Sequence, residues 1–211
     1  MTTEPMIRST SFGVNVHVVL SGDVTFVVDT GLTSRQGDVS TFFARVDPDF
    51  VVLTHHHPDH VGNARALWET RGYRIVAPRG DAAYLTGERP RPVLPLPVIG
   101  KILGRAPLVP RAALDLVGDG DDVAGWTVIA LPGHTPGQIG LLKDGVLIAG
   151  DAVGSRRGAA TLPPKFLNEH QEDARRTVRK IANLEAREVH VGHGRVLRGD
   201  AVTTLADKLG V

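Results

Sequence analysis

The chain of 211 residues contains no cysteine, so disulfide bonds and catalysis by a thiol are both excluded. It also lacks a Gly-x-Ser-x-Gly sequence and a phosphate-binding glycine loop, the motifs of one large class of serine hydrolases and of many nucleotide-binding proteins. No apolar run approaches the roughly 20 residues of a membrane-spanning helix. The first residues show no apolar core of a secretory signal. We therefore expect a cytoplasmic protein with no membrane partner.

Net charge is also small, at +1, and gives no electrostatic reason to expect a nucleic-acid partner. The apolar content of 42% is typical of an ordinary globular protein. A chain of this length can bury a full core. We expect one domain over residues 1–211 that acts on a small molecule, and a homo-oligomer is compatible with these properties.

Strand and helix signals alternate along the chain and predict a mixed α and β fold. Strands are expected at residues 14–21, 24–29, 50–53, 74–77, 126–131, 139–143, 146–149 and 189–191, and helices at residues 38–46, 59–68, 169–186 and from Asp200 through Leu209. Asp144-Gly145 is a tight hairpin signal between two strands. Asn168, three residues before Gln171, resembles a capping box at the start of a helix.

The most informative segment is the heptad Thr-His-His-His-Pro-Asp-His at residues 54–60, directly after the apolar run 50–53. Imidazole and carboxylate ligands suit zinc, iron or manganese. In an extended loop His55 and His57 point the same way, while His56 points to the other side. Asp59 and His60 then fall in the first turn of a helix, so one loop can offer ligands to two adjacent ions. The alternative is a polar loop of surface histidines.

Further ligands of the same kind follow downstream. His134 lies in Gly-His-Thr-Pro-Gly after a strand-like run, Asp151 ends an apolar run at Gly-Asp, and His193 follows a strand at Gly-His. Each residue lies beside a glycine, where the backbone can turn sharply and expose a side chain. Loops gathered at one edge of a sheet commonly form an active site.

These motifs, in this order, resemble those of the metallo-β-lactamase superfamily, and within it those of the glyoxalase II-like hydrolases. The resemblance spans about residues 14–193 and implies an αβ/βα four-layer sandwich. It also implies two divalent ions, with zinc expected and iron or manganese as alternatives. The implied ligands are His55, His57 and His134 for one ion and Asp59, His60 and His193 for the other, with Asp151 bridging them. Asp29 matches a family aspartate that supports the site from behind, and the alternative is a turn aspartate with no functional role.

The resemblance implies a metal-dependent hydrolase. Bound zinc lowers the pKa of water to about 7, and we expect a bridging hydroxide to attack a carbonyl carbon. Asp59 could hold or shuttle a proton besides ligating. A different reaction class stays open, because some relatives use one iron, at equivalents of His55, His134 and Asp151, to oxidise persulfides with dioxygen. A protein that binds metal and a ligand without catalysis is a third alternative.

The expected substrate is a small thioester, ester or lactone. The thioester comes first because the motifs are glyoxalase II-like, although the family's glutathione thioesterases carry an additional helical domain after the segment that aligns here. Many family lactonases carry a tyrosine soon after the bridging aspartate, where this chain has Ala152-Val153-Gly154. β-Lactamases generally lack that aspartate, so an amide substrate ranks lower. Arg156, Arg157 and Lys165 could receive an acidic substrate, and the alternative is solvated surface charge.

Residues 89–111 interrupt the alternating pattern with six prolines and five basic residues and no acidic residue. This insertion could be a lid or wall beside the metals. It could equally be a connection packed on the core or on a second subunit, and weak association with a membrane surface is a further alternative. The remaining histidines, which are His17, His56, His170 and His190, are expected to be surface or core residues rather than ligands.

Overall fold

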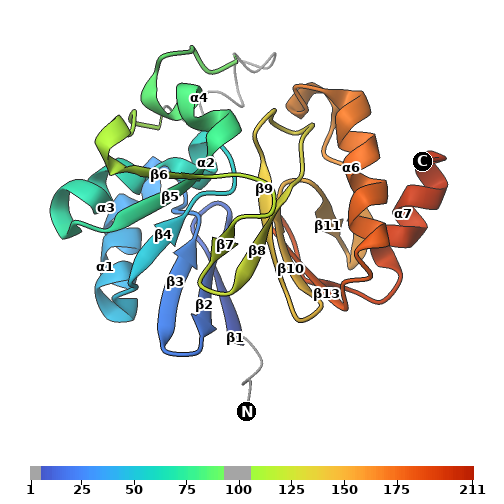
Figure 1. Ribbon diagram of the computed structural model, residues 1–211, viewed down its shortest axis with the longest axis horizontal. Coiled ribbons are helices and arrows are strands. Elements are labelled where there is room, and N and C mark those ends of the chain that lie inside the picture. Colours follow the sequence, from blue (N-terminus) through green and yellow to red (C-terminus); the bar gives the residue numbers. More distant parts are fainter. Residues whose placement is uncertain (1–5, 93–105) are drawn as a thin grey trace. The chain divides into compact units, whose positions relative to one another are not determined.

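Six strands in the first part of the chain pair in the order in which they occur (Figure 1). The computed structural model describes residues 6–92 and 106–211. β1 (Met6–Ser11), β2 (Asn15–Ser21) and β3 (Val24–Val28) are antiparallel, whereas β3, β4 (Phe50–Val52), β5 (Arg74–Pro78) and β6 (Leu114–Val117) are parallel. Val28, Val52 and Val76 are register partners. The segments that follow β3, β4 and β5 therefore leave from the same edge of the sheet.

Helices pack on one face of this sheet. They are α1 (Gln36–Val46), α2 (Pro58–Val61), α3 (Ala64–Arg71) and α4 (Ala82–Thr86), with single turns η1 (Thr33–Arg35), η2 (Arg79–Asp81) and η3 (Arg111–Ala113). Phe43 of α1 and Leu67 of α3 share a buried cluster with Val27, Val51 and Ile75 of the strands. Successive strand residues point to opposite faces, so the cluster occupies the helix-covered face. Burying each of these larger apolar side chains contributes roughly 1.5–3 kcal/mol.

A second six-stranded sheet, in the order β14-β13-β10-β9-β8-β7, forms from the later part of the chain. Its strands are β7 (Asp122–Val123), β8 (Trp126–Ala130), β9 (Ile139–Lys143), β10 (Val146–Gly150), β13 (Glu188–Val191) and β14 (Leu197–Arg198). Neighbours are antiparallel except β10 and β13, which are parallel. A separate hairpin consists of β11 (Gly154–Arg156) and β12 (Ala159–Thr161), followed by the turn η4 (Lys165–Leu167).

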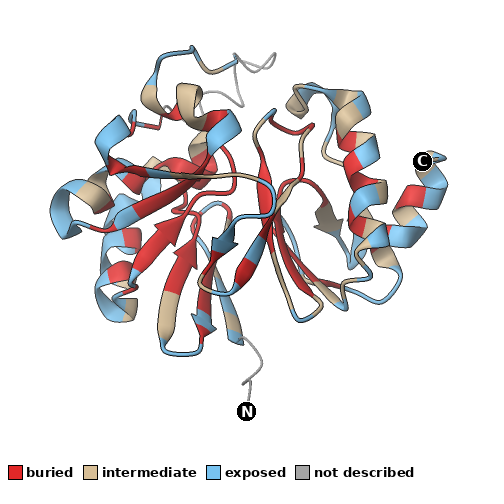
Figure 2. Ribbon diagram, viewed as in Figure 1, coloured by how far each residue is buried: buried red, intermediate tan, exposed pale blue. Residues whose placement is uncertain are grey.

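The helices α6 (Gln171–Asn183) and α7 (Ala201–Leu209) lie side by side and each buries one face (Figure 2). Val178 and Ile181 of α6 and Val202 of α7 share a buried cluster with Leu147 and Val189 of the sheet. The spacing of three to four residues between the buried positions of α6 is that of an amphipathic helix. This stripe is why the sequence predicted a helix here, although the observed helix begins two residues later and ends earlier than expected.

Most expected elements are confirmed within one or two residues, and the Asp144-Gly145 hairpin has positive φ values at both positions (48° and 72°). The helix expected over residues 59–68 is instead two helices, α2 and α3, separated at Gly62 and Asn63. A Cβ on Gly62 would lie 2.5 Å from the carbonyl oxygen of Gly31. The side-chain amide of Asn63 donates to the carbonyl oxygens of Thr30 and Gly31. These tertiary contacts bend the chain where local pattern predicted a continuous helix.

The chain divides into two compact units, Met1–Val117 and Gly118–Val211. Each consists of a sheet with helices, which confirms the mixed α and β class. The single domain over residues 1–211 stays a prediction. Most of the insertion at residues 89–111 lies outside the described residues. Among the described helices, the longest has 13 residues, and none is long and apolar enough to cross a lipid bilayer.

Candidate metal centre

The heptad at residues 54–60 connects β4 to α2 and gathers four predicted ligands, which we call the first ligand set: His55, His57, Asp59 and His60. His57 keeps extended backbone angles (φ −65°, ψ 145°), and α2 begins at the following proline, whose fixed φ suits the first helical position. The ring centroid of His55 lies 4.8 Å from that of His57 and 4.1 Å from that of His60. His60 Nε2 is 3.8 Å from Asp59 Oδ2. All but His57 are buried, so the donors of this set converge.

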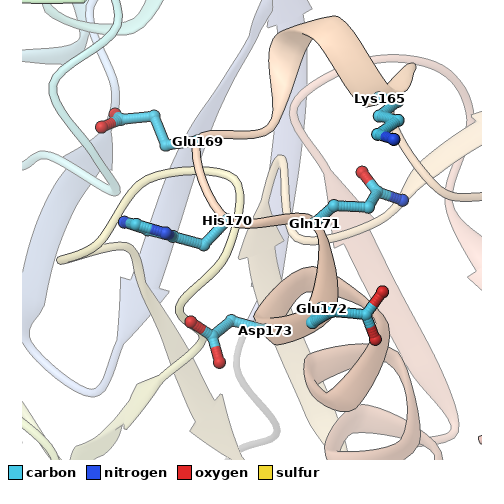
Figure 3. Close-up of a pocket in the computed structure, with 6 residues that line it drawn as sticks. All are labelled: Lys165, Glu169, His170, Gln171, Glu172 and Asp173. Carbon is cyan, nitrogen blue, oxygen red and sulfur yellow. The ribbon is translucent and has the colours of Figure 1, made fainter.

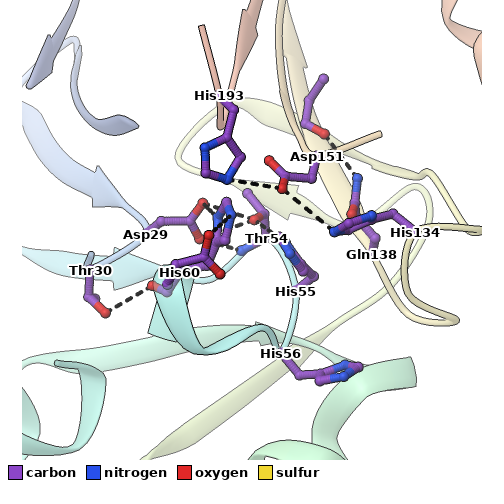
Figure 4. Close-up of polar contacts among 12 residues, drawn as sticks. Asp29, Thr30, Thr54, His55, His56, His60, His134, Gln138, Asp151 and His193 are labelled. Atoms are coloured by element: carbon purple, nitrogen blue, oxygen red, sulfur yellow. Dashed lines mark hydrogen bonds and ion pairs between the residues drawn. The ribbon is translucent and has the colours of Figure 1, made fainter. Parts of the chain in front are cut away.

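Asp29 supports the first ligand set from the end of β3 (Figure 4). It has a positive φ of 65°, and its backbone N–H donates to the carbonyl oxygen of Val52 (2.8 Å). Its carboxylate accepts hydrogen bonds from the Thr54 backbone N–H (2.9 Å), from the Thr54 hydroxyl (2.9 Å) and from His60 Nδ1 (2.7 Å). A carboxylate can only accept, so His60 carries its proton on Nδ1 and directs the Nε2 lone pair elsewhere.

The same reasoning fixes the tautomer of His55. The single proton of the Thr54 hydroxyl is donated to Asp29, so this oxygen accepts from His55 Nδ1 at 2.9 Å. His55 therefore also presents Nε2 as its lone-pair atom. Metal-binding histidines in proteins almost always donate their other ring N–H to a carboxylate or another acceptor. The donor chemistry of the first ligand set thus fits a divalent ion of the zinc, iron or manganese kind.

His56 is a core residue with a defined anchor. Its backbone N–H and its ring Nδ1 both bond Asp81 Oδ2, each at 3.0 Å, and both residues are fully buried. The His56 ring stacks on Tyr84 of α4 with centroids 4.4 Å apart. Its side chain points away from those of His55 and His60 (Figure 4), in agreement with the expected alternation. The anchoring role of Asp81 was not predicted, because nothing in the local sequence links it to a residue 25 positions earlier.

Three further predicted ligands meet in the second unit, and we call them the second ligand set: His134, Asp151 and His193. His134 follows β8, Asp151 directly follows β10, and His193 follows β13. Asp151 Oδ2 lies 3.6 Å from His134 Nε2 and 3.4 Å from His193 Nε2 (Figure 4). One carboxylate oxygen is thus approached by two imidazoles. His134 and Asp151 are buried, whereas the His193 side chain is 48% exposed.

Strand pairing brings the second ligand set together. β10 and β13 run parallel, with Gly150 paired to Val191, and the backbone N–H of Gly192 donates to the carbonyl oxygen of Gly150 (2.8 Å). Asp151 and His193 therefore leave the sheet side by side. The adjacent amide of Gln138, which is buried, donates from Nε2 to the carbonyl oxygen of Ala149 (3.1 Å) and so connects the His134 turn to the end of β10.

Asn168 contacts His134, whereas the sequence suggested a capping box for this residue. The helix α6 begins at Gln171, with His170 at the N-cap position and no capping hydrogen bond from its side chain. Asn168 Oδ1 lies 3.1 Å from His134 Nδ1, and its Nδ2 donates to Gln171 Oε1 (2.8 Å). The capping box expected from the Asn-x-x-Gln spacing is therefore wrong. Asn168 and Gln171 bond each other through their side chains, and Asn168 Oδ1 faces His134 instead of the backbone N–H groups of the helix start.

The predicted substrate-contacting residues are all exposed. Arg156 and Arg157 lie at the tip of the β11–β12 hairpin, and Lys165 begins η4. Lys165 also borders a shallow pocket at the start of α6, lined by Lys165, Glu169, His170, Gln171, Glu172 and Asp173 (Figure 3). Acidic residues in the first turn interact favourably with the positive end of the helix dipole, which accounts for Glu172 and Asp173 without a ligand. The roles of the three basic residues stay predictions.

Comparisons with a family model and with curated proteins point to the same family. Residues 10–193 match the family model described as the Metallo-beta-lactamase superfamily. The chain is 31% identical over 186 residues to the probable metallo-hydrolase YflN of Bacillus subtilis (strain 168), covering 75% of this chain and 70% of that protein. It is 35% identical over 109 residues to a hydroxyacylglutathione hydrolase of Pseudomonas putida (strain GB-1), but this covers only 49% of the chain and 32% of that enzyme.

Solved structures of similar fold extend the comparison. The archaeal metallo-beta-lactamase superfamily protein ST1585 from Sulfolobus tokodaii superposes with a TM-score of 0.78 at 20% identity, covering 96% of this chain and 85% of that one. The protein TTHA1623, solved in a di-iron-bound form, has a TM-score of 0.70 at 21% identity, covering 93% and 94%. At these identities the likeness concerns the fold, and it confirms the expected metallo-β-lactamase type.

Proposed function

This chain belongs to the metallo-beta-lactamase superfamily, and we propose that it is a hydrolase whose two ligand sets together hold two divalent metal ions. The observation that supports this most directly is the donor chemistry within each unit. In the first ligand set, hydrogen bonds to Asp29 and Thr54 leave Nε2 as the lone-pair atom of His60 and of His55. In the second, Asp151 offers one oxygen to two imidazoles. A polar surface loop would have no reason to bury and orient these atoms in this way.

The proposed assignment follows the family motif residue by residue. His55, His57 and His134 would hold one ion, Asp59, His60 and His193 the other, and Asp151 would be shared. Zinc is the proposed metal, with iron or manganese as alternatives because the donor set contains no thiolate. When bound, such ions would supply Lewis acidity and lower the pKa of coordinated water to about 7.

The residues of the chain have distinct parts in this proposal. Asp29 and Thr54 hold the rings of His60 and His55 in the orientation that ligation needs, so little reorganisation accompanies binding. Asp59 lies beside His60 in the first turn of α2, where its second carboxylate oxygen could hold a proton during turnover. Asp151 supplies negative charge at the centre of the second ligand set. The exposed Arg156, Arg157 and Lys165 are proposed to attract an acidic substrate.

The proposed substrate is a small thioester, with esters and lactones next. Support comes from the partial likeness to a hydroxyacylglutathione hydrolase, although that match covers less than half of this chain. Glutathione itself is not proposed, since most of that enzyme's length lies outside the match. The glyoxalase II-like character is likewise proposed from the motif set.

The test combines metal analysis with a hydrolysis screen. Protein purified without chelator should contain two divalent ions per chain and hydrolyse a thioester at the same rate with and without oxygen. Asp151→Asn should lower metal content and hydrolysis together. His170→Ala is the matched control, because His170 is exposed and its side chain makes no capping bond, so this variant should retain both.

Three outcomes would contradict the proposal. One is a metal-free protein that still hydrolyses the thioester. A second is an Asp151→Asn variant with normal metal content and normal rate. The third is a single iron with oxygen uptake during turnover, which would instead support the persulfide-oxidising class.

A further inference from the structure

We propose that Asn168 is a positioning residue for His134: it fixes the tautomer and ring orientation of His134 and thereby sets the affinity of the centre for its metal. This inference rests on the proposed function, because it assumes that His134 is a ligand. Asn168 belongs to none of the motifs from which the ligands were identified. It lies in the connection between η4 and α6, 34 residues after His134.

The orientation of the Asn168 amide follows from its partners. Its Nδ2 lies 3.1 Å from the carbonyl oxygen of Pro163, and a carbonyl oxygen can only accept. The nitrogen must therefore face Pro163, and its second proton reaches Gln171 Oε1 at 2.8 Å. Both donor positions of the amide are used in this way. The atom that faces His134 Nδ1 is consequently the oxygen Oδ1, at 3.1 Å.

This orientation determines the state of the His134 ring. An amide oxygen has no proton to donate, so His134 Nδ1 must carry the proton and act as the donor. In the neutral imidazole the lone pair is then on Nε2. That nitrogen lies on the side of the ring toward Asp151, 3.6 Å from Oδ2. Asn168 therefore selects the tautomer that a ligand at Nε2 requires.

The backbone around this contact is held in place on both sides. Glu169 N–H donates to the carbonyl oxygen of His134 (3.1 Å), and His170 N–H donates to that of Gly133 (2.9 Å). Gly133 has a φ of 130°, and a Cβ at this position would collide with the backbone of Ala174 in α6. The Thr177 hydroxyl donates to the carbonyl oxygen of Pro132 (2.6 Å). These contacts dock the His134 turn on α6 without any contribution from the Asn168 side chain.

A neutral amide at this position has a chemical consequence. His60 is oriented by a carboxylate (Asp29), whereas His134 is oriented by an amide, which attracts the Nδ1 proton less strongly. Replacing the amide with a carboxylate should raise the basicity of the His134 ring.

The experiment compares three variants by their metal dissociation constants, measured by competition with a chromophoric chelator. Asn168→Leu removes the acceptor and should weaken binding of the ion that His134 would hold by about 10–100-fold. Asn168→Asp keeps an acceptor at Nδ1 but loses the bond donated to Pro163, so it should weaken metal binding less than Asn168→Leu does. Gln171→Leu is the matched control, since it removes the Asn168–Gln171 bond and leaves the His134 contact. It should bind metal as wild type does.

The tautomer can also be measured in the wild-type protein, without any variant. In the metal-free chain, long-range proton–nitrogen correlation spectra should show His134 protonated at Nδ1. A ring protonated at Nε2 would overturn the inference, as would an Asn168→Leu variant with the wild-type dissociation constant. Equal weakening by Gln171→Leu and Asn168→Leu would also overturn it, because the effect would then be a general loosening of the helix start. A wild-type chain that binds no metal would refute the proposed function, a result distinct from all of these.

Discussion

Replacing Asp81 with alanine tests how firmly the heptad loop is held, independently of any bound ion. One carboxylate oxygen of Asp81 accepts hydrogen bonds from the backbone N–H and the ring Nδ1 of His56, each at 3.0 Å. Both residues are fully buried, so water cannot replace the lost acceptor. A buried donor left without an acceptor costs about 1–3 kcal/mol, so two such donors should lower the free energy of unfolding by about 2–6 kcal/mol.

The assay is denaturant unfolding of the metal-free protein, with Asp115→Ala as the control. Asp115 pairs with Arg74 at 3.1 Å, but the two side chains are 53% and 62% exposed, and exposed ion pairs contribute about 0–1 kcal/mol. Both substitutions remove an aspartate from the same unit. If Asp81→Ala lost no more stability than Asp115→Ala, the anchoring of His56 by Asp81 would be refuted.

Three further predictions concern single positions. Asp29→Asn should weaken metal binding about 10–100-fold in a chelator competition, because His60 and Thr54 lose their shared carboxylate; unchanged affinity would contradict this. Gly62→Ala should destabilise the fold by about 1–3 kcal/mol in denaturant unfolding, since the new Cβ would meet backbone atoms at 2.5 Å. Burial lowers the pKa of His190 from its ordinary 6.5. Below about pH 6.5 the unfolded chain therefore binds a proton at His190 more readily than the folded chain does. Stability should fall as pH drops below about 6.5, and His190→Gln should flatten that dependence in unfolding curves recorded at pH 5–8.

Local sequence predicted the elements whose signals are local. Apolar runs identified most of the longer strands of both sheets, and Asp144-Gly145 marked its hairpin because both residues tolerate positive φ. Six strands were not predicted: β1, β6, β7, β11, β12 and β14. The strands β7, β11, β12 and β14 have only two or three residues each, which is too short for an alternating pattern to be recognised. β1 has six residues, but none of them is buried and only Met6 and Ile7 are apolar, so it carries no apolar signal.

The predicted ligands and the residues that orient them differ in how far they could be recognised from sequence. The predicted ligands of residues 55–60 stand out because they share one short segment, and those downstream because each follows a strand at a glycine. Asp81 and Asn168 act on residues 25 and 34 positions away. Neither has a neighbouring residue that reveals its partner, and Asn168 even matched a different local motif. Contacts of this kind depend on strand register and helix docking, which only the folded chain defines.

Each hydrogen bond that orients a predicted donor ring joins residues of the same unit, those of His55 and His60 in the first unit and that of His134 in the second, and involves only protein groups. Small zinc domains order their ligands only when the metal arrives, so chelation unfolds them. Here the cost of arranging the rings of His55, His60 and His134 belongs to folding itself. We therefore expect the chain to stay folded when its metal ions are removed by a chelator, and to bind them again without unfolding.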